Sequence, residues 1–375
     1  MKARDFLDEI NKRGIYKITG VPDSTLKQFC DELQFQEDVF SHDVTANEGA
    51  AVGVAVGSFL GSGKPACVYM QNSGLGNIVN PLTSLANIDV YGIPMLFVIG
   101  WRGEPGVKDE PQHVFQGKIT CEMLDVLQVD YSVIDKESTL TELEQILDLA
   151  WEAFAKNMQY AIVVKKGTFE KDREYVWENA YSLNREEVLG VILEKIPANA
   201  CIVSTTGKIS RELYEQSDAR KGNHDNLFMS VGGMGHASMI ALGVADEQKN
   251  RKVICVDGDG ATLMHMGSLA FIASKATENF YHIIINNQAH ESVGAMPTGC
   301  MNTSIAEVAR AVGYKYAERI TTLEELLRIC NVIESEKGPC LFEIMVGLGS
   351  RADLGRPKES ARENKENFMQ FCMNK

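Results

Sequence analysis

Basic residues are scarce relative to acidic ones in this sequence of 375 residues. It has 37 lysines and arginines against 51 aspartates and glutamates, which gives a formal net charge of −14. A field of this sign repels nucleic acids, so a nucleic-acid partner is not expected. An apolar run of about 18 residues, the length that crosses a bilayer, is also missing, so no membrane partner is expected. The first residues, MKARDFLDEINKRG, lack the apolar core of a signal peptide, and we expect a cytoplasmic protein.

Paired cysteines are absent as well. The 9 cysteines include no CxxC motif, which disfavours both a zinc site of the usual spacing and a disulfide framework. Several lie in apolar runs, such as Cys67 in ACVYM and Cys255 in VICVD, so we expect reduced cysteines in the core. The chain also lacks a G-x-G-x-x-G after an early strand and the GK[ST] of a Walker A motif. Nicotinamide and P-loop nucleotide sites are therefore disfavoured.

Short apolar runs alternate with longer segments of helical periodicity along the whole chain. With 45 % AVILMFWYC, the chain is long and apolar enough for two or three ordinary domains. This alternation predicts an α/β fold in which mostly parallel sheets carry helices on both faces. Helical patterns include Thr139–Asn157 and Arg185–Lys195. The predicted strands are Ile15–Thr19, Ala66–Met70, Met95–Ile99, Ala161–Val164, Ile202–Thr205, Val253–Asp257, His282–Ile285 and Leu341–Val346.

The two halves of the chain have the same predicted architecture. A charged, weakly periodic stretch separates them, and we interpret it as an interdomain linker. The predicted division is a first domain over residues 1–168, a linker over 169–184, and a second domain with a C-terminal tail over 185–375. The tail, from Arg351 onward, is polar and contains several basic residues. It fits either a frayed, solvated end or a segment that binds an anionic substrate.

A regular run of glycines lies in the first half. Gly49, Gly53, Gly57 and Gly61 recur every four residues, which places them on one face of a helix. A glycine inside a helix costs up to about 1 kcal/mol relative to alanine, so four in register indicate close packing. The pattern fits a tightly packed core helix or a helix seated at a subunit interface, and the sequence leaves both open.

The strongest chemical signal is VICVDGDGATLMHMGSLAFIASKATENFYHIIINNQAH, which begins at Val253. A predicted strand ends in Gly258-Asp259-Gly260 and a second one ends in Asn286-Asn287. The spacing predicts a helix of about one and a half dozen residues between them. Both polar clusters lie at the carboxyl ends of neighbouring parallel strands, where open α/β sheets bind ligands. Carboxylate and amide oxygens suit Mg²⁺, and the glycines let a diphosphate approach backbone N–H groups.

This segment resembles the signature of the thiamine-diphosphate-dependent enzyme family. VTANEGAAVGVAVG, STTGKISRELYE and VGGMGHASMIALGVA extend the resemblance. It implies thiamine diphosphate and Mg²⁺ as cofactors, a first domain of the pyrimidine-binding type and a second of the diphosphate- and Mg²⁺-binding type. It implies that Asp259, Asn287 and the carbonyl of Ala289 bind the metal, while Asn286 is a structural residue. The implied cofactor contacts are Glu48, Thr206, Gly207, Gly232, Met234, Gly258, Asp259, Gly260, Ala261 and Asn287.

The resemblance gives Glu48 a catalytic role. It implies that Glu48 hydrogen-bonds the aminopyrimidine ring of a cofactor held by a neighbouring subunit. A charged residue so close to an apolar helix should be partly buried. The plainer alternative is a first-turn glutamate that the helix dipole stabilises. Because the two halves of the site come from different subunits, the resemblance implies a homodimer or higher homo-oligomer with active sites at its interface.

Within that family, the sequence resembles one group of decarboxylases most. The halves meet near residues 165–185, which leaves no room for the central third domain of most thiamine-diphosphate decarboxylases. GVPDSTLKQF, NNQAHESVG and GSRADLGRP are among the segments similar to the phosphonopyruvate decarboxylase family. Sulfopyruvate decarboxylases are also similar, but they commonly divide the halves between two chains, so a fused chain favours the phosphonate. The family implies decarboxylation of 3-phosphonopyruvate, an anionic 2-keto acid, to phosphonoacetaldehyde and CO₂ in phosphonate biosynthesis of the 2-aminoethylphosphonate type.

Recognition of a phosphonate needs cationic hydrogen-bond donors, preferably arginine. The catalytic candidates besides Glu48 are Asp23, His113 and His290. The substrate-binding candidates are Ser24, Asn72, Ser73, Arg102, Lys108, Lys118, Arg351 and Arg356. Two other functions stay open. One is decarboxylation of sulfopyruvate or another small 2-keto acid, and the other is a cofactor-binding subunit without catalytic activity.

Overall fold

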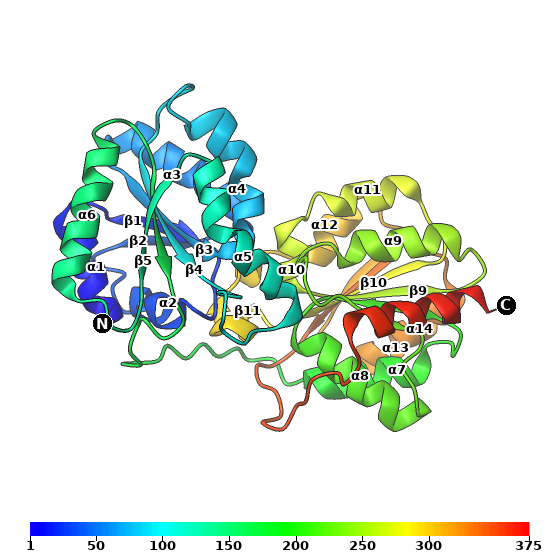
Figure 1. The fold of residues 1–375 in the computed structure, drawn as a ribbon. Coiled ribbons are helices and arrows are strands. Elements are labelled where there is room, and N and C mark those ends of the chain that lie inside the picture. The colour runs from blue at the N-terminus through cyan, green and yellow to red at the C-terminus, as the bar shows by residue number, and fades with distance from the viewer. Residues whose placement is uncertain (375) are drawn as a thin grey trace. The chain divides into compact units, whose positions relative to one another are not determined.

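The computed structural model describes residues 1–374, which form two compact units. Unit 1 comprises Met1–Trp177 and Ser292–Met296, and unit 2 comprises Glu178–Glu291 and the chain from Pro297 onward. Each unit contains a six-stranded sheet with helices on both faces (Figure 1), as the α/β prediction requires. None of the helices in the described part of the chain is both long and apolar enough to cross a membrane.

Unit 1 has a parallel sheet with the strand order β2-β1-β3-β4-β6-β5. Its strands are β1 (Lys17–Gly20), β2 (Ser41–Val44), β3 (Ala66–Gln71), β4 (Met95–Gly100), β5 (Asp130–Ile134) and β6 (Tyr160–Val164). Its helices are α1 (Ala3–Lys12), α2 (Lys27–Gln34), α3 (Glu48–Ser62), α4 (Leu75–Pro81), α5 (Pro111–Val126) and α6 (Leu140–Phe154). Apolar residues of α1, α2 and α6 form the core on one face of the sheet, and those of α3, α4 and α5 form it on the other.

Unit 2 repeats this plan with the strand order β13-β14-β10-β9-β7-β8, again parallel. Its strands are β7 (Cys201–Ser204), β8 (Leu227–Met229), β9 (Val253–Gly258), β10 (Phe280–Asn286), β13 (Tyr316–Ile320) and β14 (Cys340–Met345). Its helices are α7 (Arg185–Lys195), α8 (Lys208–Lys221), α9 (Ala237–Glu247), α10 (Asp259–Met264), α11 (Ser268–Lys275), α12 (Ile305–Val312), α13 (Leu323–Ser335) and α14 (Ala361–Met373). The two-residue strands β11 (Ala289–His290) and β12 (Met296–Pro297) lie outside the large sheets.

All the strands predicted from the sequence are present, and they are the four central strands of each sheet. Central parallel strands are covered on both faces, so they appear as continuous apolar runs, as in MLFVIG of β4. The set of strands is nevertheless incomplete, because the sequence pattern does not reveal β2, β5, β8 and β13. These are the edge strands, and their partly exposed residues, such as SHDV in β2 and YAERI in β13, give no apolar run.

The single long helix predicted after Gly260 is wrong. The chain forms the short helices α10 and α11, separated by residues 265–267. His265 has φ −134° and ψ 47°, which is not helical, and Gly267 is the N-cap of α11. Histidine and glycine are weak helix formers, so this is where the helix ends. Almost every residue of α10 is buried, whereas α11 buries only one side.

The glycines of α3 do not pack in the core of unit 1. Gly53, Gly57 and Gly61 are exposed, and a Cβ atom added at any of them would meet nothing within 4 Å. The opposite face of α3 carries the buried residues, including Val52 and Val56. The core-helix interpretation of the glycine run is therefore wrong for these three positions, and the subunit-interface interpretation stays a prediction.

The C-terminal tail is not frayed, contrary to the plainer of the two expectations. It forms α14, which begins with a capping box at Ser360. The Asn364 carboxamide accepts a hydrogen bond of 2.9 Å from the Met229 amide and donates one of 2.9 Å to the Leu227 carbonyl. Phe368 is buried beside it. The helix thus covers the free edge of β8, which removes an exposed row of backbone groups.

Candidate active site

The two motifs of the long segment, GDG and NN, are brought together in unit 2. Gly258 lies opposite Ile285 in the register of β9 and β10, so the residues that follow both strands emerge at one edge of the sheet. Asp259 begins α10 and is buried, and its carboxylate accepts a hydrogen bond of 2.6 Å from the Thr298 hydroxyl. The Thr298 amide donates to the Gln288 carbonyl at 2.9 Å. Thr298 therefore ties Asp259 to the turn after β10.

Two asparagine side chains hold the turn after β10. Asn286 accepts a hydrogen bond of 2.9 Å from the Gln288 amide and donates one of 2.8 Å to buried Glu343, as expected of a structural residue. Asn287 Oδ1 accepts from the Ala289 amide at 3.1 Å. Gln288 has a φ of +61°, in the left-handed region, so the chain turns tightly between the two expected metal ligands.

A cluster of charged side chains around Glu291 orients the Asn287 side chain. Its Nδ2 donates a hydrogen bond of 2.7 Å to Glu291. Glu291 also accepts from Arg185 and, at 2.9 Å, from Lys208, while Arg185 makes a bidentate pair of 2.7 Å with buried Glu212. Because Glu291 accepts from the amide nitrogen, the Asn287 carboxamide is oriented with its oxygen on the other side.

The other expected cofactor residues of unit 2 gather at the same edge. A Cβ atom added at Gly260 would lie 3.0 Å from the His290 ring and 3.4 Å from the Met234 methyl group, so these three residues are in close contact. The Thr206 hydroxyl donates to the Val231 carbonyl at 3.1 Å, which joins the loops after β7 and β8. The remaining expected residues follow β7, β8 and β9: Gly207, Gly232, Gly258 and Ala261.

The donors at this edge fit a divalent hard cation. Burial raises the pKa of Asp259 to about 7, although the Thr298 hydroxyl and backbone amides that donate to its carboxylate act in the opposite direction. A bound Mg²⁺ would stabilise the charged form, and carboxylate, amide and carbonyl oxygens are the ligands it prefers. A residue larger than glycine at position 260 would press against the His290 ring and the Met234 methyl group. The oxygen donors present therefore fit Mg²⁺.

Glu48 occupies the first position of α3 in unit 1, and its residue is only 5 % exposed, as expected. Its Oε2 accepts a hydrogen bond of 2.6 Å from Asn77 Nδ2. A Cβ atom added at Gly74 would lie 2.5 Å from Glu48 Cγ, so only glycine fits there. Gly74 and Asn77, at the start of α4, therefore restrict the orientation of the Glu48 carboxylate.

A second polar cluster lies at the carboxyl ends of β1, β3 and β4 in unit 1. Arg102 donates to Asp109 at 2.8 and 2.5 Å, and its Nη1 donates to the Ser24 hydroxyl at 2.9 Å. Asn72 exchanges hydrogen bonds of 3.1 and 2.8 Å with the backbone of Arg102. Asp23 is fully buried, and its carboxylate accepts a 2.8 Å bond from the backbone amide two residues on. These predicted residues form one cluster.

Burial shifts the pKa of both His113 and Asp23, and the positive charge of Arg102 acts to lower each. Burial lowers the pKa of His113, and the charge of Arg102 lowers it further. Burial raises the pKa of Asp23 to about 6, although a backbone amide and Arg102 act in the opposite direction. In unit 2, burial lowers the pKa of His290 to about 4. At neutral pH the His290 imidazole is therefore neutral, so one ring nitrogen can accept a hydrogen bond and the other can donate one.

The remaining predicted substrate residues are not part of this cluster. Lys108 and Lys118 are exposed, and the exposed Ser73 hydroxyl accepts a hydrogen bond from Gln71. Arg351 belongs to unit 2, where it pairs with Glu186, Glu215 and Asp353. Arg356 is also in unit 2 and is exposed. For all of these residues, a contact with substrate stays a prediction.

Sequence reasoning did not single out the residues that hold the site in place. These are Asp109, Glu291, Thr298 and Glu343. Several of their partners lie far along the chain, as with Asn286 and Glu343, which are 57 residues apart. The one available signal is Glu343 itself, an acid inside the apolar run CLFEIM, because a charge in a buried strand requires a partner. Its partner is Arg319, at 3.0 Å.

We predict that Asp23→Asn stabilises the protein at pH 8. The native pKa of about 6 lies above the unfolded value near 4, so stability falls as the pH rises from about 4 to about 6, and the full cost of the buried charge is present above that range. At pH 4 native Asp23 is protonated and most of the cost is gone. The free energy of unfolding should rise by about 2 kcal/mol at pH 8 and by much less at about pH 4. Urea unfolding at both pH values measures the difference. The exposed control Asp38→Asn should change the two values little, and a gain at the lower pH equal to that at pH 8 would contradict the argument.

Comparison with known proteins places this fold and site in one class. Residues 2–125 match the family described as "Thiamine pyrophosphate enzyme, N-terminal TPP binding domain", and residues 206–344 match its "C-terminal TPP binding domain". Proteins named phosphonopyruvate decarboxylase from Streptomyces hygroscopicus and Streptomyces viridochromogenes are 34 % and 33 % identical to this chain. They match 99 % and 98 % of it, and the matches span 94 % of each relative. The chain therefore belongs to the thiamine pyrophosphate enzyme family and, within it, to the phosphonopyruvate decarboxylase family.

A single fused chain does not by itself distinguish the phosphonate from the sulfonate. A protein named sulfopyruvate decarboxylase from Methanosarcina acetivorans is 27 % identical, with 84 % of both chains covered. It thus spans both halves, although relatives named as alpha or beta subunits of sulfopyruvate decarboxylase match only one half each. Fusion therefore favours the phosphonate without deciding it. The distinction rests instead on the higher identity and nearly complete coverage of the two phosphonopyruvate decarboxylases.

Proposed function

We propose that this chain decarboxylates 3-phosphonopyruvate to phosphonoacetaldehyde and CO₂, with thiamine diphosphate and Mg²⁺ as cofactors. The observation that carries the proposal is the 34 % identity to a phosphonopyruvate decarboxylase over nearly the full length of both chains. The two clusters described above support it, because they supply donors for a metal, a diphosphate and an anionic substrate. We place the pyrimidine-binding role in residues 1–168 and the diphosphate-binding role in residues 185–375.

In this proposal the edge of the unit 2 sheet holds the cofactor. Asp259, the Asn287 amide oxygen and the Ala289 carbonyl bind Mg²⁺. Bound thiamine diphosphate supplies the electron sink that accepts the electron pair when CO₂ leaves. Met234 would contact the bound cofactor. Further contacts come from Thr206, Gly207, Gly232, Gly258, Gly260 and Ala261.

The residues of unit 1 handle protons and the substrate. Glu48 would hold or release a proton at its carboxyl group, where it would hydrogen-bond the aminopyrimidine ring of the bound cofactor. Asp23 has a pKa of about 6, so it can carry or release a proton near neutral pH. His113 and His290, both neutral at pH 7, are further candidates for moving protons to the product. Arg102 and Ser24 are the first candidates for binding the phosphonate and carboxylate, and buried Asn72 positions the Arg102 backbone.

Arg102→Gln should weaken recognition of the phosphonate selectively. Asp109 holds the Nε edge of the guanidinium, which directs Nη1 toward exposed Ser24. Loss of a hydrogen bond to a charged group costs about 1.5–3 kcal/mol, so KM for phosphonopyruvate should rise about 10- to 150-fold. KM for pyruvate, which has no phosphonate, should change little. Arg351→Gln, measured in parallel, tests the unit 2 arginine. Equal increases for both substrates in either variant would show that the arginine does not bind the phosphonate.

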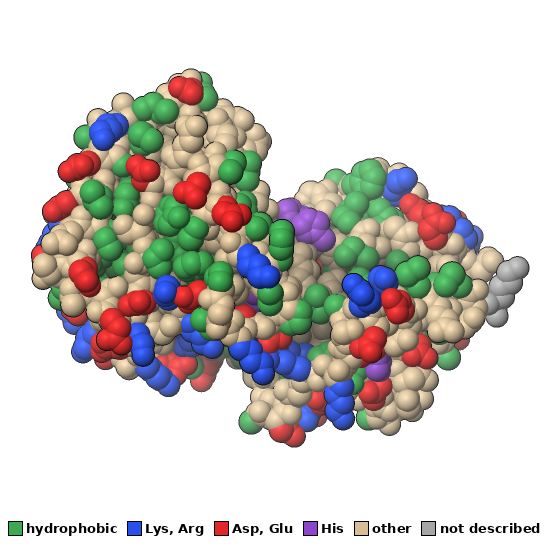
Figure 2. Space-filling model, viewed as in Figure 1, with side chains coloured by type: hydrophobic (Ala, Val, Ile, Leu, Met, Phe, Trp, Pro, Cys, Tyr) green, Lys and Arg blue, Asp and Glu red, His purple; other side chains and the backbone are tan. Residues whose placement is uncertain are grey.

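We also propose that the active protein is a homodimer or larger homo-oligomer in which Glu48 serves a cofactor held by the neighbouring subunit. The exposed glycine face of α3 begins one turn from Glu48 and would let a second backbone approach closely. Leu60 on α3 is 71 % exposed and Tyr91 is 70 % exposed, and apolar side chains reach the surface of unit 1 among the charged ones (Figure 2). Exposed apolar surface of this kind is typical of protein–protein contacts.

Gly57→Arg should break the oligomer without unfolding the chain. Arginine is a better helix former than glycine by up to about 1 kcal/mol, and the added side chain meets nothing within the subunit. The melting temperature of the isolated subunit should therefore not fall, whereas close approach of a second subunit is blocked. Light scattering coupled to size exclusion measures the mass. The matched control Gln145→Arg, on exposed α6, should keep the wild-type mass. A Gly57→Arg protein of wild-type mass would contradict the interface.

The decisive test measures CO₂ release from phosphonopyruvate, sulfopyruvate and pyruvate, with and without thiamine diphosphate and Mg²⁺. Cofactor-dependent preference for phosphonopyruvate is expected. Preference for sulfopyruvate would support the second candidate function, which the Methanosarcina relative favours. Cofactor binding without release from any of the three acids would overturn the enzymatic proposal and favour a non-catalytic subunit.

A further inference from the structure

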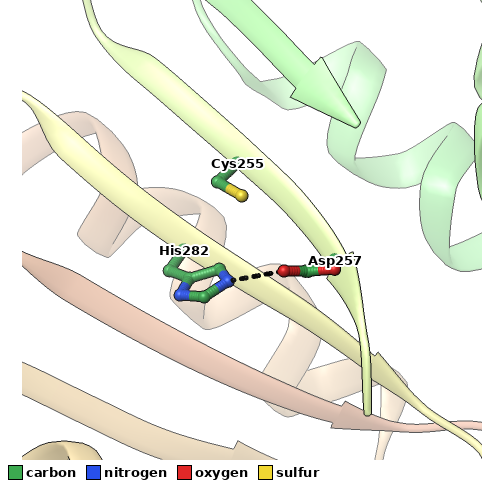
Figure 3. A group of neighbouring side chains, drawn as sticks. All are labelled: Cys255, Asp257 and His282. Atoms are coloured by element: carbon green, nitrogen blue, oxygen red, sulfur yellow. Dashed lines mark ion pairs between the residues drawn. The ribbon is translucent and has the colours of Figure 1, made fainter. Parts of the chain in front are cut away.

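A group of polar side chains lies inside unit 2, next to the residues assigned to the cofactor but sharing none with them. Cys255 and Asp257 are two residues apart on β9, so both point to the same face of the sheet. His282 on β10 lies opposite Cys255 in the register and shares that face. The thiol, a carboxylate oxygen and an imidazole nitrogen all lie within 4.8 Å of one another. Figure 3 shows the imidazole directed at the Asp257 carboxylate, 3.6 Å away, with the cysteine sulfur beside them.

Most polar atoms of these buried side chains lack a hydrogen-bond partner, although Oδ1 of Asp257 accepts a bond of 3.0 Å from the Gly258 amide. Cys255 and His282 are 0 % exposed and Asp257 is 1 % exposed. Both ring nitrogens of His282 and Oδ2 of Asp257 lack a partner among the described residues. An unsatisfied buried group costs about 1–3 kcal/mol, so several at one place call for a missing ligand. The surroundings cannot supply one, because the cluster belongs to a core of residues such as Leu269 and Ile284.

The donor set identifies the class of ligand. Thiolate sulfur, imidazole nitrogen and carboxylate oxygen together are typical of Zn²⁺, whereas Mg²⁺ and Ca²⁺ take oxygen ligands. The charges also balance: one thiolate and one carboxylate neutralise a divalent ion, which suits an apolar core.

We propose that Cys255, Asp257 and His282 form a structural Zn²⁺ site between β9 and β10, with a water completing the coordination. Zinc–ligand distances of about 2.0–2.3 Å require the three side chains to draw slightly closer together than they are here. The site shares no residue with the proposed Mg²⁺ ligands, and it offers sulfur and nitrogen donors where they offer only oxygen. It joins the two strands that lead into the Asp259 and Asn287 turns, so the ion would hold those turns at a constant separation.

The test uses tag-free full-length protein, purified from cells grown with added zinc or with added cobalt. Mass spectrometry of the metal should find about one zinc ion per chain, the stoichiometry of a structural site. The cobalt form should show a thiolate-to-cobalt charge-transfer band. Cys255→Ser and His282→Gln should lose most of the metal, and Cys255→Ser should lose the band. Circular dichroism establishes that each variant is folded.

Two controls separate this site from other sources of metal. Cys340→Ala removes a buried cysteine from β14 on the opposite face of the same sheet, and it should keep both the zinc and the band. Asp259→Ala should also keep the band, because that site contains no thiolate. Wild-type protein with less than about a tenth of an equivalent of zinc would overturn the proposal. So would wild-type zinc content in folded Cys255→Ser and His282→Gln.

Discussion

Glu48→Gln should bind thiamine diphosphate normally but lose decarboxylation by at least about 100-fold, the scale of general acid–base catalysis. Glutamine is isosteric with glutamate, so the packing against Gly74 is preserved. Asn77 can rotate its carboxamide to donate or accept at the new amide. What the variant cannot do is exchange a proton at the side chain. The expected result is a fall in kcat with little change in cofactor affinity.

Steady-state CO₂ release and calorimetric cofactor titration measure the two properties separately. The matched control is Glu122→Gln on α5, an exposed glutamate of the same unit, and it should behave as wild type. Wild-type turnover in Glu48→Gln would remove Glu48 from the mechanism. Loss of cofactor binding together with activity would show that its role is structural.

Asp259→Ala should abolish Mg²⁺-dependent binding of the cofactor. Asp259 is the one carboxylate in the proposed ligand set, and loss of even an outer-shell partner lowers metal affinity about 10- to 100-fold. We therefore expect at least a 100-fold or so weaker affinity for thiamine diphosphate at fixed Mg²⁺. The control Asp246→Ala, at a partly exposed position on α9, should leave it unchanged. Unchanged affinity in Asp259→Ala, measured by calorimetry, would contradict the ligand assignment.

The same variant has a second, independent readout. The native pKa of Asp259 of about 7 lies above the unfolded value, so in metal-free protein the buried charge costs stability above pH 7. Metal-free Asp259→Ala should therefore melt at a higher temperature than wild type at pH 8. The order should reverse when thiamine diphosphate and Mg²⁺ are added, because only wild type is stabilised by binding them. A variant that melts lower in both conditions would be damaged in its fold.

Thr298→Val tests a residue that supports a proposed metal ligand, because the Thr298 hydroxyl donates to the Asp259 carboxylate. The Thr298 amide also joins the turn after β10. Loss of the hydroxyl should weaken cofactor binding less than loss of the carboxylate does, in line with an outer-shell role.

The central part of the fold is predictable from the sequence because central parallel strands are buried on both faces. Strands such as β4 and β9 then consist of apolar residues, and the polar residues that end them stand out. Asp259 and Asn287 were found in this way, as strand-end residues at one edge of a parallel sheet. Edge strands such as β2 are half exposed and leave no comparable pattern.

The supporting contacts of the site are not predictable from spacing. The carboxylate of Glu291 joins Asn287 to Arg185, 106 residues earlier, and Glu343 joins Asn286 to Arg319. Each of these acids has many basic residues available along the chain. Which arginine reaches it depends on how helices and strands pack, and that is a property of the tertiary structure.

Hydrophobic patterning and residue chemistry by themselves determined the class of fold and the strand ends that carry the ligands, because these depend on local periodicity and on the side chains present. The cofactor followed from the resemblance of the motifs to a known family. Only the tertiary structure decided which face of α3 is exposed, where the helix after Asp259 ends, and that the C-terminal residues cover β8. It alone placed Cys255, Asp257 and His282 together. Those outcomes depend on contacts between segments distant in the chain, where the free energy of burial, rather than local preference, selects the arrangement.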